Sequence, residues 1–324
     1  MWDFSMTQAL GLMRRTAPFV LFRVIVYFGI SAAFILVTGT GAGIGWGVGA
    51  FGDEDFQINS TFYGGLIGFA GTAGLLFFLR DYILYIVKAG HIAVMVEIMQ
   101  GGQVPGGRGQ IEHATAVVKA RFGEASALFA LDKLIKGIVG VVTGLIQGIL
   151  NFLPIPGLDQ MMGVVRAYLR VSVGLVDEVI LAHGIKTKAE NPWSSAQDAL
   201  VLYAQNARPM LVNAAWLTLI SYGLAFVVFL IMLAPAAAVV YLIPGAWSAG
   251  GFVFAILFAW AVKAALIEPF AIACLLQVFF KVTDGQQPDP VWRAKLDAAT
   301  AKFKELGTRA ATWAGARFSG STGV

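Results

Sequence analysis

No Asp, Glu, Lys, Arg or His occurs between Arg208 and Lys263. A soluble domain carries roughly 25% charged residues, and no surface in water omits them over such a length. Only 13% of the 324 residues are charged and 58% are hydrophobic. Because each helical crossing takes about 20 apolar residues, there is room for about four to six transmembrane helices. The sequence therefore predicts an all-α, polytopic integral membrane helix bundle with additional interfacial amphipathic helices.

The expected spans lie within a membrane domain of residues 1–290, at 20–38, 61–87, 137–153, 158–183, 210–233 and 252–280. Lys and Arg are absent from 24–79 and 137–165, so the basic residues fall between apolar blocks. Since cytoplasmic loops are enriched in Lys and Arg, we expect both termini in the cytoplasm, as in a protein of a bacterial inner membrane. Residues 137–183 have two interpretations, a pair of crossings or a re-entrant hairpin, because the charges within 158–183 are costly in lipid.

Several segments are expected to be helical without crossing the bilayer. An N-terminal amphipathic helix on the membrane is indicated by Trp2, Phe4, Met6, Leu10 and Met13. Residues 88–136 read as a helix-turn-helix broken at the glycines of 101–107. A later helix begins near Pro192, with Ser194 and Gln197 at the spacing of a capping box. Pro235 and Pro244 indicate an uncharged outer turn after the span 210–233.

A basic amphipathic tail is expected over residues 291–324. Its apolar residues alternate at spacings of four and three: Trp292, Leu296, Ala299, Phe303, Leu306, Ala310 and Trp313. Positive charges surround this stripe: Arg293, Lys295, Lys302, Lys304 and Arg309. The pattern predicts a helix on a bilayer surface with anionic lipid headgroups as partners. A short coiled coil or a contact with another subunit is the alternative.

Glycines recur four residues apart in the apolar blocks. The ladders are Gly39, Gly43 and Gly47; Gly41, Gly45 and Gly49; Gly64 and Gly68; and Gly140, Gly144 and Gly148. Such ladders allow close packing of helices within or between subunits, which is typical of a homo-oligomer or a subunit of a membrane complex. A broken, partly extended segment at 39–52 is the other interpretation. The G-x-G-x-x-G match ending at Gly52 lacks the strand that a dinucleotide site requires.

Ionisable residues within the apolar blocks are the sharpest functional clue. Lys263 and Glu268 stand inside the last span, where an isolated charge costs at least about 2.5 kcal/mol. Five residues apart on an α-helix, they point to different sides. Candidate partners lie on the segment 158–183, which predicts a polar seam of Arg166, Arg170, Asp177, Glu178, Lys263 and Glu268.

The seam has two interpretations. Pro269 removes a backbone donor directly after Glu268, and transporters often bend or bind a solute at such a point. The seam is then a path for a solute or proton. In the other interpretation a structural ion pair holds two helices together while Lys263 reaches an interface.

Motifs for other chemistry are lacking. There is no Walker motif, H-E-x-x-H, G-x-S-x-G or Cys/His metal spacing, and Cys274 is the single cysteine. We therefore expect no enzyme, cofactor or metal. The net charge of +4 is attributed to the cytoplasmic excess of Lys and Arg rather than to nucleic acid.

The segment Ser195-Ala-Gln-Asp-Ala-Leu-Val-Leu-Tyr-Ala-Gln-Asn206, followed by an apolar stretch from Met210, resembles the helix before a late span in choline transporter-like proteins. Similar helices precede spans in uncharacterised bacterial membrane proteins. The resemblance covers the second half of the chain, which is shorter than those transporters and has no large external loop, and it transfers no binding residue. It implies a cation or amine as solute. The expected function is thus non-enzymatic passage of a small solute or ion, with an oligomeric membrane scaffold or accessory subunit as the alternative.

Overall fold

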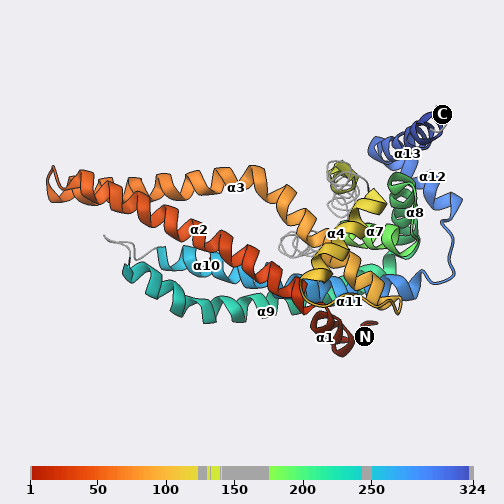
Figure 1. The fold of residues 1–324 in the computed structure, drawn as a ribbon, viewed down its shortest axis with the longest axis horizontal. Coiled ribbons are helices and arrows are strands. Elements are labelled where there is room, and N and C mark those ends of the chain that lie inside the picture. Colours follow the sequence, from red (N-terminus) through yellow and green to blue (C-terminus); the bar gives the residue numbers. More distant parts are fainter. Residues whose placement is uncertain are drawn as a thin grey trace, which may run out of the picture. The chain divides into compact units, whose positions relative to one another are not determined.

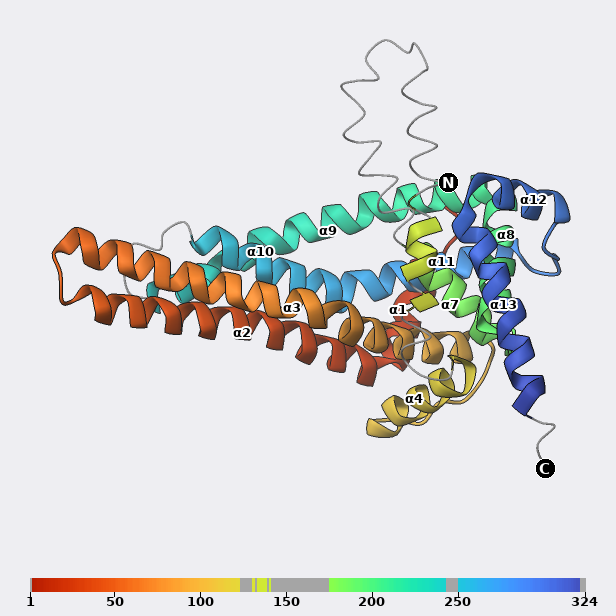
Figure 2. The same ribbon diagram turned by 90° about the horizontal axis from the view of Figure 1, so that it is seen from above.

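The computed structural model describes residues 2–122, 130–131, 133–138, 140, 175–242 and 250–320 of the chain. All elements in these ranges are helices (Figures 1 and 2). In chain order they are α1 (Met6–Arg15), α2 (Ala17–Gly49), α3 (Glu54–Met99), α4 (Arg108–Phe122), α7 (Val176–Lys186), α8 (Pro192–Gln205), α9 (Ala207–Leu242), α10 (Gly250–Val262), the π-helical turn η1 (Lys263–Ile267), α11 (Glu268–Val282), α12 (Pro290–Ala299) and α13 (Ala301–Gly320).

Three of the described helical stretches are long and apolar enough to cross a membrane: Ala17–Gly49, Ala207–Tyr241 and Gly251–Val282. Each has more than 30 residues, and at 1.5 Å per residue such a helix exceeds a hydrocarbon core of about 30 Å. Helix α3 covers the expected span 61–87 in one piece. Of the expected spans 137–153 and 158–183, residues 141–174 lie outside the described part of the chain.

The chain forms two compact units. One consists of Phe19–Val87 and Ile220–Pro269 and is called the apolar unit below; the other consists of Met1–Pro18, Lys88–Leu219 and Phe270–Val324 and is called the charged unit. Only three of the 23 Lys and Arg residues, Arg23, Arg80 and Lys263, belong to the apolar unit. Nearly all basic residues therefore belong to the charged unit, although this unit is made of three separate stretches of the chain.

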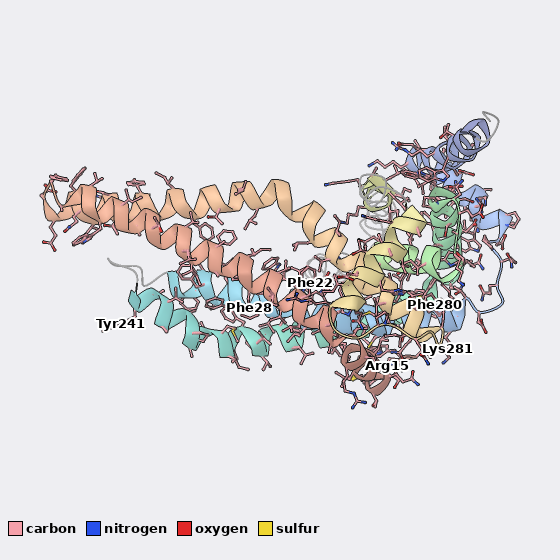
Figure 3. All side chains as sticks on the ribbon, in the orientation of Figure 1. Arg15, Phe22, Phe28, Tyr241, Phe280 and Lys281 are labelled. Atoms are coloured by element: carbon pink, nitrogen blue, oxygen red, sulfur yellow. The ribbon has the colours of Figure 1, made fainter. Side chains whose placement is uncertain are left out.

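The apolar unit is built from long helices that lie side by side: α2 pairs with the N-terminal part of α3, and α9 with α10 (Figures 1 and 2). Small side chains fill one core cluster, where Ala42, Ala236 and Ala255 surround Phe254. Large apolar side chains point outward, including Leu36, Ile44, Ile67, Phe226 and Tyr241, the last of which is labelled in Figure 3. A surface of this composition is typical of helices that face lipid.

The glycine-rich end of α2 is helical up to Gly49, so the alternative of a broken, extended segment is wrong. In apolar surroundings backbone amides bond best to each other, which favours the helix despite its glycines. α3 then begins after Asp53, whose Oδ1 accepts a hydrogen bond of 2.8 Å from the Phe56 amide. This cap closes the α2–α3 hairpin.

Helix packing uses one of the two glycine ladders of α2. A Cβ at Gly41 or Gly45 would lie within 3.0 Å of backbone atoms of α3, and the same holds for Gly64 and Gly68 against α2. Gly49 packs equally closely on Gln57 of α3. By contrast, a Cβ at Gly39, Gly43, Gly47 or Gly140 would meet nothing within 4 Å, and Gly144 and Gly148 lie outside the described residues. The close approach of α2 and α3 is thus made by Gly41, Gly45 and Gly49 on α2 and by Gly64 and Gly68 on α3.

Helix α9 continues through Pro235 to Leu242, which corrects the expected turn at Pro235. Proline removes one backbone donor from a helix. Ending the helix would expose several more donors and acceptors in apolar surroundings, where no water can bond to them. Keeping the helix therefore costs less than ending it there.

The charged unit holds the shorter helices. α3 ends at Met99, and Gly101 and Gly107 have positive φ angles of 82° and 60° in the turn that leads to α4. Side-chain amides clamp the N-terminal segment: Asn213 bonds to Asp3, and Gln277 accepts from the Ser5 amide at 2.9 Å. α1 follows directly, capped by the Ser5 hydroxyl. The N-terminal helix predicted from the sequence is therefore present and fixed to α9 and α11.

Helix α8 begins with Asn191 as its N-cap, not with the predicted capping box of Ser194 and Gln197. The Asn191 Oδ1 accepts from the amides of Trp193 and Ser194. Pro192 occupies the first helical position, where its fixed φ is favourable. Asn is as good an N-cap as Ser, so the cap directly before the proline is preferred.

Part of the apolar stripe of the tail is covered by α8 of the same chain. Phe303 and Leu306 are fully buried, the Gln197 side chain donates to the Phe303 carbonyl, and Arg293 pairs with Asp198. The prediction that this stripe lies on lipid is therefore wrong for Phe303 and Leu306. Charged residues of the tail remain exposed, among them Lys295, Lys302 and Lys304.

Two tryptophans of the tail are half-buried. Trp292 lies under the ammonium of Lys295 at 4.4 Å, and Trp313 is in the last turns of α13. Basic side chains of α12 and α13, such as Lys295 and Lys304, are exposed beside them.

Candidate functional site

Arg23 is the most unusual side chain of the apolar unit. It lies on α2, within a stretch long enough to cross a membrane, and is 0% exposed. Its Nε and one terminal nitrogen donate to the Ala264 carbonyl at 3.2 and 2.5 Å. The same terminal nitrogen lies 3.1 Å from Oε2 of Glu268. One guanidinium thus binds both a backbone carbonyl and a carboxylate.

The Ala264 carbonyl is available because of the π-helical turn. In an α-helix it would accept from the amide of Glu268, but that amide donates to the Lys263 carbonyl instead. The next residue, Pro269, has no N–H to offer. The Ala264 carbonyl therefore receives no backbone hydrogen bond from residue 268, as in an α-helix, or from residue 269, as in a π-helix. Arg23 of another helix donates to it instead. Single π-turns inside α-helices occur frequently at functional sites.

An aromatic ring lies beside the guanidinium. The centroid of the Tyr27 ring lies 5.5 Å from the central carbon of Arg23, and Tyr27 meets Trp260 edge-on. Ala261, Ala264 and Ala265 pack around Tyr27 in the same core cluster. A cation over an aromatic face is favoured most where water is excluded. The arginine is thus held by hydrogen bonds, charge and ring contacts together.

Glu268 keeps limited access to the surface, with 23% of its side chain exposed against 1% for Arg23. Lys263 is also partly exposed. In the π-turn the amide of Glu268 donates to the carbonyl of Lys263, five residues earlier, instead of to the residue four earlier. The angle between the side chains of Lys263 and Glu268 about the helix axis therefore differs from that in a regular α-helix. A buried arginine therefore lies next to a carboxylate that is partly exposed.

Asp177 and Glu178 belong to α7 of the charged unit, where Glu178 pairs with Lys88 at 2.6 Å and Asp177 with Lys136 at 3.8 Å. Arg166 and Arg170 lie outside the described residues. Glu268 belongs to the seam predicted from the sequence, whereas Arg23 of the expected span 20–38 does not. Its position inside the stretch 20–38 was the signal that identifies it as an intramembrane charge.

His183 of α7 titrates in an unusual environment in the charged unit. Its ring meets Phe279 edge-on at 6.1 Å between centroids. Burial lowers the pKa of His183, an effect that Lys186 reinforces and Asp198 opposes. Among the described residues, no group of three or more His, Cys, Asp or Glu side chains could hold a metal ion.

Acidification below about pH 6.5 is expected to destabilise the protein through His183. The unfolded chain binds a proton at the ordinary His pKa of about 6.5, whereas the folded chain, with its lowered pKa, resists it. Stability is therefore full above the unfolded pKa and falls as pH drops below it. Unfolding temperatures of the wild type and His183→Gln, measured in detergent from about pH 7.5 to about pH 5, should diverge on acidification. Parallel curves would contradict this role.

Comparisons of the chain with known protein families, with curated proteins and with solved structures find no match.

Proposed function

We propose that this chain is a multi-pass membrane protein that passes a small solute or ion along the Arg23–Glu268 pair. The observation that carries the proposal is the shared use of Arg23 by the Ala264 carbonyl and the Glu268 carboxylate. An ionisable group inside a membrane span is costly, at least about 2.5 kcal/mol, and marks an ion or substrate path in many transporters. Interrupted helices with carbonyls outside the regular ladder bind ions and solutes in such proteins.

The residues have distinct roles in this proposal. Arg23 is held by two hydrogen bonds to Ala264 whether or not Glu268 binds it. The Glu268 carboxylate is therefore the group that can exchange partners. A cation or protonated amine, the solute class implied by the resemblance to choline transporter-like proteins, would compete with Arg23 for this carboxylate. Passage then consists of successive exchange at Glu268 while the arginine stays in place.

The distribution of charge supports a membrane orientation. Because cytoplasmic segments carry the excess of Lys and Arg, we assign the charged unit, with both termini, to the cytoplasm. The apolar unit, with three of 23 basic residues, is assigned to the bilayer. Helix α3 would supply a crossing in addition to the three stretches Ala17–Gly49, Ala207–Tyr241 and Gly251–Val282.

Thiol labelling tests the path without knowledge of the solute. In a Cys274→Ser background, Lys263→Cys should react with a small, charged, membrane-impermeant thiol reagent in sealed vesicles. The matched control is Leu266→Cys, three residues along the same turn, at a position with an exposed apolar side chain. A thiol in lipid stays protonated and unreactive, so this control should be protected. Labelling of Lys263→Cys alone supports a hydrated path.

Protection at both positions, in protein that still folds, would contradict the path. It would favour the second candidate, an oligomeric scaffold or accessory subunit. One observation supports that function: a Cβ added at Gly39, Gly43 or Gly47 of α2 would meet nothing within 4 Å. A bare face of small residues allows a helix of another subunit to approach closely.

A further inference from the structure

The charged unit contains a cavity of about 620 Å³ lined by residues from α1, α3, α7 and α11 and by the N-terminal segment. Cavities of this size lie in the range of small-molecule sites. Two lysines line it, Lys186 of α7 and Lys281 of α11, and Lys281 is labelled in Figure 3. Neither lysine has a carboxylate partner in the described part of the chain. Neither ammonium group therefore forms an ion pair with a described carboxylate.

Other groups of the wall are consistent with an anionic ligand. Asp3 is the single acidic residue that lines the cavity, and both its Oδ2 and its amide are bonded to the Asn213 side chain, at 2.8 and 2.6 Å. Gln277 is engaged with the Ser5 backbone. The Gln8 side chain also lines the cavity and makes no hydrogen bond among the described residues. The wall thus offers two cations and one uncommitted amide against a single carboxylate, so its net charge is positive.

Aromatic rings also line this cavity. The Lys186 ammonium lies 4.4 Å from the centroid of the Phe280 ring. Trp2 packs on Phe4 and meets Trp216 edge-on. Lys281 is the last residue but one of the stretch Gly251–Val282, and Trp216 lies near the start of Ala207–Tyr241. Tryptophan and lysine at the ends of spans are typical of the headgroup region of a bilayer.

We propose that this cavity binds a phosphate-bearing anion, with Lys186 and Lys281 as the cationic ligands. Its position at the end of a candidate span favours the headgroup of an anionic phospholipid over a soluble phosphate ester. The proposal is independent of the solute path, since it uses no residue of the Arg23–Glu268 pair.

Ligand-induced thermal stabilisation tests the proposal on the full chain in a neutral detergent. The probes are short-chain phosphatidylglycerol, short-chain phosphatidylcholine and glycerol phosphate. Wild-type protein should be stabilised by phosphatidylglycerol more than by phosphatidylcholine. Each lysine near an anionic headgroup contributes about 1 kcal/mol, so Lys186→Gln/Lys281→Gln should weaken binding by about 30-fold.

The matched control is Lys119→Gln/Lys304→Gln, which removes the same charge from two exposed helical positions that do not line the cavity. This control should bind like the wild type. A response to phosphatidylglycerol alone identifies lipid as the source, and an equal response to glycerol phosphate identifies a soluble ester; both support the anion site. No stabilisation of the wild type, or an equal loss in both double variants, would overturn the proposal.

Discussion

Arg23→Leu is expected to lower the free energy of unfolding by about 3–5 kcal/mol, the usual cost of removing one partner of a buried ion pair. The substitution leaves the Ala264 carbonyl without a donor and the Glu268 carboxylate without its guanidinium. Titration with a denaturing detergent, followed by tryptophan fluorescence, would measure the loss.

A second substitution shows that charge is the cause. Glu268→Gln replaces the carboxylate by a neutral group of the same shape, so Arg23→Leu/Glu268→Gln should be more stable than Arg23→Leu alone. The double variant still lacks a donor for Ala264 and should therefore not reach wild-type stability. If the two single losses simply added, the pair would not be coupled and the site as described would be wrong.

Gly45→Ala is expected to destabilise the α2–α3 hairpin by about 1–3 kcal/mol, the range found for overpacking. The new Cβ would come within 3.0 Å of the Ser60 carbonyl, which belongs to the backbone of α3 and cannot rotate away. The helices would have to separate. The same denaturing titration measures this effect.

Gly43→Ala is the matched control, two residues away on the same helix. Its Cβ would meet nothing within 4 Å, and alanine favours a helix over glycine by up to about 1 kcal/mol. Gly43→Ala should therefore leave stability unchanged or raise it. Equal losses at both positions would show that the hairpin does not depend on the close contact of Gly45 with α3.

The predicted helical class is confirmed in the described residues because it follows from local properties. A long apolar stretch has to form its own backbone hydrogen bonds, and in a membrane a helix is the simplest way to do so. The same reasoning failed at Pro235, where a local breaker was outweighed by the cost of unbonded amides on both sides. It also failed at Ser194, where two good caps competed and Asn191 was used.

The tail shows where periodicity stops being informative. Its apolar stripe runs over two helices, α12 and α13, which are separated by the extended residue Thr300. The pattern is the same whether these residues meet lipid, another subunit or the same chain. The burial of Phe303 and Leu306 against α8 depends on a contact between segments about a hundred residues apart. No local signal distinguishes these alternatives.

The sequence by itself determined the helices, the apolar stretches and the presence of a costly carboxylate at Glu268, because these depend on the order of neighbouring residues. Only the tertiary structure decided that Arg23 is its partner and that the Gly41–Gly45–Gly49 ladder packs on α3. Arg23 and Ala264 are separated by 241 positions, so their pairing is set by how helices pack. The π-turn that frees the carbonyl depends on Pro269 locally, but its use depends on an arginine that another helix supplies.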